Sequence, residues 1–549
     1  MTIDFQTSPD LYRHWRLEIE GEIARLVMDV DQDGGLFEGY ELKLNSYDLG
    51  VDIELYDALQ RIRFEHPAVG AVILQSAKDK VFCAGANIRM LASATHAHKV
   101  GFCKFTNETR NSIEQASEYS GIKFIAAIQG ACAGGGYELA LACDHLVLVD
   151  DGNSSVALPE VPLLAVLPGT GGLTRLTDKR KVRRDRSDIF CCIEEGIKGE
   201  KAVEWRLVDQ IAARSQFDEI VTATARELAQ QSQRCADTGI ALKPLQRNIS
   251  GDEVNYSTVT VQIQRRKGIA RITVNGPTEA PAGDIDTLHT MGDQFWPLRA
   301  ARELDDALLH LRSNEDEIGL LEFATSGDPE LMMAMDRFLE QHAEHWLVRE
   351  ILLQWTRVLK RIDLTARSLV ALIEPGSCFA GTLAEIAFAC DRSFMALGEF
   401  EDNDLPEAQI ALTDANFGRH PMSNGISRIA TRFLGEPQSI ETAEKNKYLM
   451  IDPSRAEELG LVTASYDDID WQDEVRIFLE ERVSFSPDAM TGMEANLRFA
   501  GPETMETKIF GRLTAWQNWI FQRPNAVGEE GALRRYGSGQ KANFNRQRV

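Results

Sequence analysis

The chain has 549 residues, a hydrophobic content of 44% and a formal net charge of −25 at pH 7. This length predicts two to four structural units, and the acidic balance argues against general binding to nucleic acid or to an anionic membrane surface. A small anionic ligand is not excluded, because it needs only a local cluster of cations.

The location predicted from the sequence is the cytoplasm. No run of about 18 apolar residues occurs, so no membrane-spanning helix is expected, and the first residues lack the basic and apolar regions of a secretory signal. The nine cysteines form no CxxC pair, and most of them stand in apolar runs. This usage is typical of reduced thiols rather than of a disulfide framework.

The first third of the chain alternates predicted strands with predicted helices, which indicates an α/β fold. Alternating or short apolar runs mark the strands, and longer periodic segments mark the helices. Strands are predicted over residues 15–19, 23–30, 71–74 and 124–128, and helices over 54–63 and directly after the glycines 134–136.

Those three consecutive glycines follow an apolar strand, and Glu138 stands in the first turn of the helix behind them. Glycines at a strand-to-helix junction let a ligand approach the backbone closely. They also leave N–H groups at the positive end of the helix, where an oxyanion can bind. Glu138 beside such donors is a candidate catalytic base. The alternative is a glycine-rich turn that only permits close packing.

The chain also repeats itself at a spacing of about 247 residues. Three anchors recur in the same order: Ile23-Ala24-Arg25 as Ile269-Ala270-Arg271, Glu54-Leu55 as Glu303-Leu304, and Ala140-Leu141-Ala142-Cys143-Asp144 as Ala387-Phe388-Ala389-Cys390-Asp391. This predicts a catalytic unit over residues 1–255, a degenerate copy that serves as scaffold over 256–485, and a helical C-terminal segment over 486–549. In that segment Ile509, Leu513, Trp516 and Ile520 share one helix face.

The second copy has lost most of the chemistry-bearing residues of the first. Gly134-Gly135-Gly136-Tyr137-Glu138 is replaced by Gly381-Thr382-Leu383-Ala384-Glu385. We therefore predict one active site per chain, in the N-terminal half. The survival of Glu385 without its glycines means that a glutamate at this position can also be purely structural.

Residues 80–89, 156–161 and 167–176, together with the glycine motif, resemble the crotonase (enoyl-CoA hydratase/isomerase) superfamily over roughly residues 12–225. The resemblance implies a spiral of repeated ββα units that binds an acyl-CoA thioester. It implies that the N–H groups of Ala86 and Gly135 form the oxyanion hole, and that Glu138 and Glu160 are the acid/base pair. Two carboxylates in one site should titrate as a coupled pair.

The same resemblance implies a binding loop for CoA at Ala84, Asn87, Ile88 and Arg89. For the CoA phosphates, Arg89 is favoured over the basic run 179–186, for which a solvated helix face or a subunit contact is the better interpretation. Cys103 follows this loop and is a candidate to assist a late step, although an inert core cysteine is the alternative. No metal site and no cofactor other than the CoA of the substrate are expected.

The double length and the glutamate pair look like the ring-cleaving lyases of this superfamily. That resemblance implies opening of 2,3-epoxybenzoyl-CoA with water to a semialdehyde CoA thioester and formate. The alternatives are an enoyl-CoA hydratase or isomerase acting on another acyl chain, and a non-catalytic acyl-CoA-binding scaffold. A dehydrogenase fusion is disfavoured, because no GxGxxG motif follows a strand. A homodimer is the expected assembly.

Overall fold

The structure is a computed structural model that describes residues 2–234, 238–400 and 405–549. Its contacts divide the chain into two compact units, one of Phe5–Pro244 and the other of Leu245–Val549 with the first four residues. The first unit therefore ends before the boundary predicted at residue 255, because residues 248–255 form strands that pair within the second unit. The C-terminal segment 486–549 belongs to that second unit as well.

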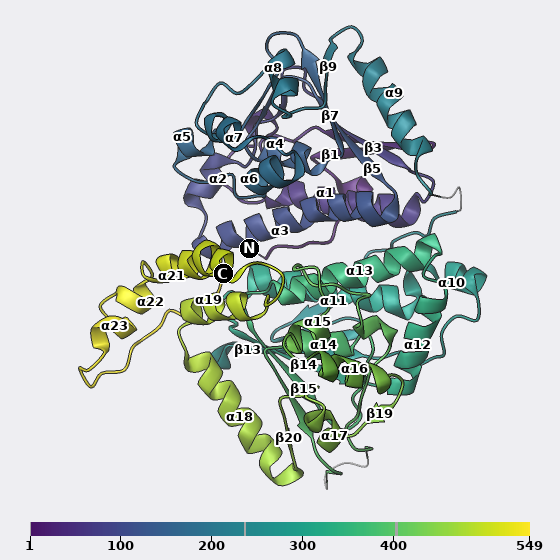
Figure 1. Ribbon diagram of the computed structural model, residues 1–549, viewed down its shortest axis with the longest axis vertical. Coiled ribbons are helices and arrows are strands. Elements are labelled where there is room, and N and C mark those ends of the chain that lie inside the picture. The colour runs from purple at the N-terminus through teal and green to yellow at the C-terminus, as the bar shows by residue number, and fades with distance from the viewer. Residues whose placement is uncertain (1, 235–237, 401–404) are drawn as a thin grey trace. The chain divides into compact units, whose positions relative to one another are not determined.

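The first unit is built on a sheet with the strand order β1-β2-β3-β5-β7-β9 (Figure 1). β1 and β2 form an antiparallel hairpin, and the following strands are parallel. The bounds are β1 (Trp15–Glu20), β2 (Ile23–Met28), β3 (Ala71–Ser76), β5 (Lys123–Ile128), β7 (His145–Asp150) and β9 (Gln210–Ala213). The smaller parallel sheet is β4 (Val81–Cys83), β6 (Ala131–Ala133) and β8 (Ser155–Ala157). All four predicted strands are confirmed.

Helices connect these strands, as parallel pairing requires. Their bounds are α1 (Leu49–Glu65), α2 (Ile88–Ser93), α3 (His96–Gln115), α4 (Gly135–Ala142), α5 (Glu160–Leu164), α6 (Gly172–Thr174), α7 (Arg184–Cys191), α8 (Gly199–Glu204) and α9 (Phe217–Gln230). α1 begins five residues before the predicted helix 54–63, because the Asp48 side chain caps it by accepting from the N–H groups of Gly50 and Val51.

One face of the larger sheet packs against α9. Alternate strand residues point to this face, and α9 presents side chains one turn apart. The buried cluster consists of Ile23, Ala71, Ile73, Ile125, Ala127, Val147, Val149 and Ala212 from the strands, with Phe217, Val221, Ala225 and Ala229 from the helix. This core fixes the strand ends from which the loops of the candidate site emerge.

The second unit repeats the arrangement of a hairpin followed by parallel strands, in the order β10-β11-β12-β13-β14-β15-β17-β20. The bounds are β10 (Asn248–Ser250), β11 (Glu253–Asn255), β12 (Val259–Gln264), β13 (Ile269–Asn275), β14 (Leu320–Ser326), β15 (Ser368–Ile373), β17 (Arg392–Ala396) and β20 (Ala464–Tyr466). Its smaller sheet is β16 (Phe379–Ala380), β18 (Ile410–Ala411) and β19 (Met450–Ile451). Equivalent contacts recur: Tyr12 donates to Asp57 in one unit and Tyr256 to Asp306 in the other.

Helices cover the second unit and continue into its C-terminal segment. Their bounds are α10 (Ile285–Met291), α11 (Trp296–Asn314), α12 (Pro329–Gln341), α13 (Trp346–Asp363), α14 (Ala384–Ala389), α15 (Arg428–Arg432), α16 (Pro437–Lys445), α17 (Pro453–Glu458), α18 (Asp468–Ser484), α19 (Pro487–Leu497), α20 (Met505–Lys508), α21 (Thr514–Ile520), α22 (Pro524–Val527) and α23 (Ala532–Arg535). Within the described residues, no helix is both long enough and apolar enough to cross a bilayer.

The apolar face predicted in the C-terminal segment is only partly covered. Trp516 and Ile520 lie against Gly492 of α19, where an added Cβ would come within 2.9 Å of the Ile520 Cδ1. Ile509 and Leu513 stay 39% and 49% exposed.

Candidate active site

Each of the three consecutive glycines is required by a different contact. Gly134 has φ +54°, in the left-handed region that favours glycine. A Cβ on Gly135 would lie 2.0 Å from the Tyr47 hydroxyl, and one on Gly136 would lie 2.5 Å from the carbonyl oxygen of Cys83. The glycines therefore do permit close packing at this turn. Close packing does not explain the backbone amides that the turn leaves without a hydrogen-bond acceptor among the described residues.

The loop before α2 meets the start of α4 at these glycines. The Cα of Gly85, with φ +90°, lies against the Gly135 nitrogen, and a Cβ there would be 2.8 Å from it. Tyr47 holds the loop by donating from its amide to the Gly85 carbonyl and accepting from the Asn87 amide. The amides of Ala86 and Gly135 donate no hydrogen bond to any residue that the structure describes. Two free donors at adjoining positions are what an oxyanion hole requires.

Glu138 is buried on α4, with 2% of its surface exposed, and is held by three donors from one loop. Its Oε1 accepts from the amides of Thr170 at 2.9 Å and Gly172 at 2.7 Å. Its Oε2 accepts from the Thr170 hydroxyl. Donors of this kind stabilise the ionised form of a carboxylate and fix its orientation.

Glu160 begins α5 and lies on the other side of Gly134. A Cβ on Gly134 would be 2.9 Å from the Glu160 Oε1. The Oε2 of Glu160 is buried and has no hydrogen-bond partner among the described residues. Burial first, and the negative charge of Glu138 second, raise the pKa of Glu160 to about 7. The pair predicted from sequence thus consists of one carboxylate with three donors and one without side-chain partners, which separates their chemistry.

Cys103 lies on α3, where both burial and the charge of Glu138 raise its pKa to about 11. The side chain is therefore a neutral thiol at pH 7, which does not suit a thiolate nucleophile. Its interaction with Glu138 places it near the candidate site, and its assisting role stays a prediction.

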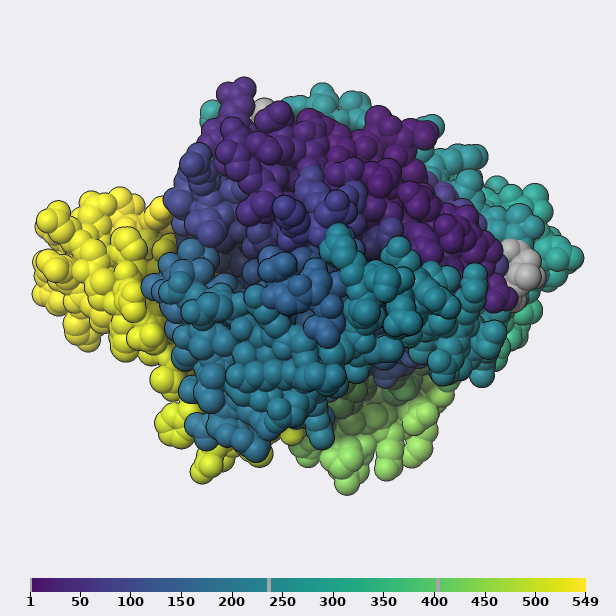
Figure 2. All heavy atoms as spheres, turned by 90° about the horizontal axis from the view of Figure 1, so that it is seen from above, coloured from purple at the N-terminus to yellow at the C-terminus, as the bar shows by residue number. Residues whose placement is uncertain are grey.

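The residues predicted to bind CoA line one open cavity of about 220 Å³. Its walls come from the loop before α2 and from the segment before α1: Glu41, Lys43, Ser46, Ala84, Ala86, Asn87, Ile88 and Arg89. Ile88 is 56% exposed, and Arg89 brings a cation to the cavity, whereas Lys43 pairs there with Glu41 at 2.7 Å. Figure 2 shows early (purple) and later (blue to teal) segments of the first unit next to one another on one face of that unit.

The basic run 179–186 is mostly engaged elsewhere. Lys179 pairs with Glu114, Arg180 with Asp209, Arg183 with Asp185 and Arg186 with Glu204. These pairings engage the cations of the run with carboxylates. The predicted solvated helix face is not observed, because the run spans the end of a π-helix (Arg175–Lys179), a non-helical stretch at 180–183 and the start of α7, and the Arg180 side chain is only 9% exposed.

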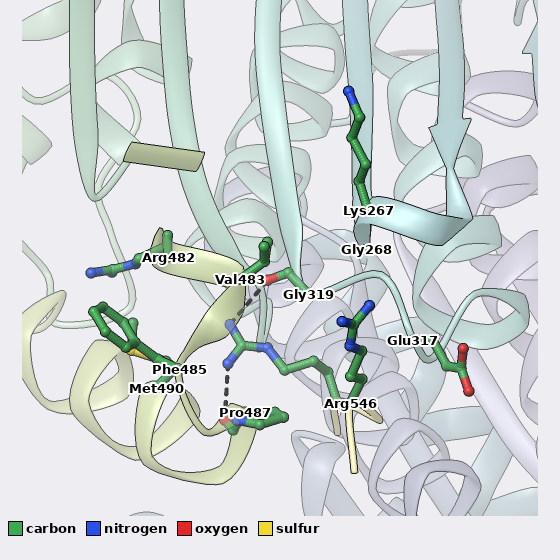
Figure 3. Close-up of a pocket in the computed structure, with 11 residues that line it drawn as sticks. Lys267, Gly268, Glu317, Gly319, Arg482, Val483, Phe485, Pro487, Met490 and Arg546 are labelled. Carbon is green, nitrogen blue, oxygen red and sulfur yellow. Dashed lines mark hydrogen bonds between the residues drawn. The ribbon is translucent and has the colours of Figure 1, made fainter. Parts of the chain in front are cut away.

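The second unit has a small basic cavity of about 30 Å³, and its cations are not arranged as a binding site for one anion. Lys267 and Arg482 point in different directions there (Figure 3). The buried Arg548 donates to the carbonyl oxygens of Gly319 and Pro487. The cations of this cavity therefore do not converge on one ligand position. Within the described part of the chain, no group of three or more His, Cys, Asp or Glu is arranged to hold a metal ion.

Sequence reasoning missed three residues that shape the site: Thr170, Tyr47 and Arg110. Thr170 lies inside a motif that the sequence analysis had singled out, so its position was a usable signal. Arg110 is fully buried on α3 and donates to the Tyr47 hydroxyl at 3.1 Å and to the Gly135 carbonyl at 3.4 Å. No local sequence pattern indicated Tyr47 or Arg110, because both shape the site through contacts with segments that are distant in the sequence.

Comparison with known proteins agrees with this geometry. Residues 41–268 match the enoyl-CoA hydratase/isomerase family. The whole chain is 55% identical, over 550 aligned positions, to the benzoyl-CoA-dihydrodiol lyase of Aromatoleum evansii, of which it covers 98%. The chain belongs to the benzoyl-CoA-dihydrodiol lyase family. The crotonase-like fold expected from the sequence is thereby confirmed for the first unit.

Other relatives match less than half of the chain. The fatty acid oxidation complex subunit alpha of Shewanella sp. (strain MR-4) is 30% identical over 49% of this chain and 34% of its own length, so the match spans about a third of that relative. The solved enoyl-CoA hydratase from Bacillus anthracis is 26% identical, with a TM-score of 0.34, over 39% of this chain and 76% of that structure.

Proposed function

We propose that the chain opens the ring of 2,3-epoxybenzoyl-CoA, using two waters to release formate and 3,4-didehydroadipyl-CoA semialdehyde. One observation carries the proposal: two free amides, of Ala86 and Gly135, stand beside two carboxylates whose surroundings differ. The full-length identity to a benzoyl-CoA-dihydrodiol lyase supports the substrate class.

In this proposal the thioester oxygen binds between the amides of Ala86 and Gly135, which stabilise negative charge as it develops there. Removing one such donor typically lowers the rate by about a hundredfold to a thousandfold. Glu138, as a carboxylate, accepts a proton from the attacking water, and Glu160, partly protonated near pH 7, donates one to the opening epoxide oxygen.

Carbon–carbon cleavage follows when a glutamate removes a proton from a ring hydroxyl and the bonding electrons move toward the thioester. A second water then adds to the one-carbon fragment, which leaves as formate. The neutral thiol of Cys103 is available as a hydrogen-bond donor in that last step. In this proposal CoA binds along Ala84, Asn87, Ile88 and Arg89. The guanidinium of Arg89 pairs with the CoA phosphates.

The proposal includes the cellular location of the enzyme, its assembly and its cofactor requirement. The cysteines that the structure describes are free thiols, a state expected in the cytoplasm. A homodimer is the proposed assembly, and the half-exposed side chains of Ile509 and Leu513 would suit a subunit contact. No cofactor is required in this scheme beyond the CoA of the substrate.

Formate release from enzymatically generated 2,3-epoxybenzoyl-CoA, followed by mass spectrometry, tests the proposal. Crotonyl-CoA hydration is measured in parallel, because a hydratase would use the same two glutamates. Formate with little crotonyl-CoA turnover supports the lyase. Fast hydration without formate assigns the chain to the hydratases, and binding without turnover of either substrate assigns it a scaffold role.

A further inference from the structure

The feature that the proposed mechanism leaves unused is the loop that holds Glu138. Three donors reach this carboxylate from residues 170 and 172, more than thirty positions along the chain from it. Both N–H groups go to Oε1, and only the Thr170 hydroxyl reaches Oε2. Because a carboxylate can rotate about its last side-chain bond, the two amides fix one oxygen but do not fix the plane of the group.

We propose that the Thr170 hydroxyl is the positioning group that sets the carboxylate plane of Glu138 against the free amide of Gly135. This proposal rests on the proposed function of Glu138 as the base. The Thr170 hydroxyl donates to the Glu138 Oε2, so in this proposal it acts through Glu138. Both amides donate to Oε1, so among the described contacts the hydroxyl is the one that decides where Oε2 points.

The loop that carries Thr170 is itself held in place from α3. The Asn107 side chain donates to the Gly169 carbonyl at 3.1 Å, and Arg175 donates to the Thr170 carbonyl at 3.1 Å. Gly171 has φ +91°, and a Cβ there would lie 2.0 Å from the Arg175 Nη1. The backbone at Gly171 therefore packs directly against the Arg175 guanidinium, and residue 171 cannot carry a side chain.

Arg175 is in turn oriented by two partners on the same helix. It pairs with Glu114 at 2.9 Å and donates to the Asn111 side chain at 2.8 Å. Thr170 is 4% exposed and Arg175 is 7% exposed, so bulk water does not compete for these contacts. A rigid chain of hydrogen bonds thus runs from α3 through the loop to the Glu138 carboxylate, as a precisely held base requires.

The test compares three variants of full-length protein. Thr170→Val keeps the shape and both amide donors but removes the hydroxyl, and Thr170→Ser keeps the hydroxyl. Thr177→Val is the matched control, because its exposed hydroxyl bonds only to helix carbonyl oxygens of Leu173 and Thr174. We expect Thr170→Val to lower kcat about tenfold to a hundredfold with KM unchanged. Thr170→Ser and Thr177→Val should stay close to the parent protein.

A double-mutant cycle with Glu138→Gln shows whether Thr170 acts through Glu138. Thr170→Val should lower kcat in the parent protein but cause no further loss in the Glu138→Gln background. Unchanged kcat in Thr170→Val, an equal loss in Thr170→Ser, or the same loss in both backgrounds would overturn the proposal.

The same cycle is also measured as thermal unfolding without substrate, which separates this proposal from the proposed function. The Tm shifts of Thr170→Val and Glu138→Gln should be non-additive if the two side chains are coupled, and additive shifts contradict the coupling. If the parent protein releases no formate, the proposed function fails, and the kinetic arm is then run on crotonyl-CoA while the Tm cycle still decides the coupling.

Discussion

The two units share the same backbone arrangement around Gly134 and Gly381, but the polar groups near these glycines have different hydrogen-bond partners. Gly134 donates to the Ala157 carbonyl at 3.0 Å, and Gly381 donates to the Ala411 carbonyl at the same distance. Four residues past each glycine stands a buried glutamate, Glu138 or Glu385. The frame therefore survives in both units, and the difference between them lies in the partners of a few polar groups.

The amide that is free in the first unit is occupied in the second. Thr382 takes the place of Gly135, and its N–H donates to the Asp336 carboxylate at 2.8 Å, as does its hydroxyl at 2.7 Å. Asp336 lies on α12 and is fully buried, and burial raises its pKa to about 6. A carboxylate of the chain itself thus fills the position at which the first unit leaves a donor free.

The two glutamates differ in the same way. Glu385 pairs with the Arg428 guanidinium at 2.8 Å, and Arg428 also pairs with Asp363 at 2.7 Å. In the first unit the equivalent arginine, Arg175, pairs with Glu114 and donates to the loop rather than to Glu138. The Glu385 carboxylate is thus held in an ion pair with a buried cation, whereas the Glu138 carboxylate is held by neutral donors.

The largest expected effect separates Glu138 from Glu385 in catalysis. Glu138→Gln should lower formate release by about a hundredfold to ten-thousandfold, because in the proposed mechanism Glu138 accepts a proton from the attacking water. Glu385→Gln should leave turnover per folded molecule unchanged. Steady-state kinetics of both variants checks this, and equal losses would mean that the second unit takes part in catalysis.

Next in size is the loss of the buried cation in the second unit. Arg428→Met removes the buried cation that pairs with both Asp363 and Glu385, which should destabilise the second unit by about 3–5 kcal/mol. Calorimetry that resolves the unfolding transitions measures this. Arg455→Met is the control, because its partner Glu458 is 69% exposed, and such surface pairs contribute about 1 kcal/mol or less. A similar shift in both variants contradicts the prediction.

A smaller, pH-dependent effect distinguishes Glu160 from Asp414, which stands three residues past Ala411 as Glu160 stands three residues past Ala157. The folded protein raises the pKa of Glu160 from 4.5 to about 7, so it binds this proton more tightly than the unfolded chain does. Stability is therefore lost as the pH rises from about 4.5 to about 7, by at most about 3 kcal/mol. Glu160→Gln removes this loss and should raise the Tm at pH 8 more than at pH 5.

The sign is reversed at Asp414, where the Lys447 and Tyr448 side chains lower the pKa. Its contribution is present above its ordinary pKa and is lost as the pH falls through the lowered value. Asp414→Asn should therefore lower the Tm at pH 8 and have little effect in strong acid. Parallel pH profiles for the two variants would contradict the contrast between the sites.

The smallest expected effect is at Thr382. Thr382→Ala removes one hydroxyl contact to Asp336 but keeps the amide contact, so the second unit should lose about 1 kcal/mol of stability. Turnover should not change. A thermal shift assay and the formate assay together check this, and an altered kcat with intact stability would show that the occupied position affects the reaction.

Much of the fold was predictable because it follows from short-range patterns. Apolar alternation located β1 and β2, and the recurrence of Glu54 as Glu303 revealed the duplication before any contact was known. Glu54 accepts from the backbone amide just before β1, and Glu303 accepts from the backbone amide just before β12, the first strand of the equivalent hairpin. The boundary at 255 was not predictable from the repeat, because β10 and β11 add to the second sheet without a counterpart in the first unit.

The amino-acid sequence alone determined the glycine turn, the order of the motifs and the presence of two glutamates, since each depends on residue type and spacing. Only the tertiary structure decided that Glu138 receives donors from Thr170 and Gly172, that the Glu160 Oε2 is buried with no hydrogen-bond partner among the described residues, and that Asp336 accepts from the matching amide. These outcomes depend on which distant segments supply hydrogen bonds and exclude water, and no local pattern in the chain encodes that choice.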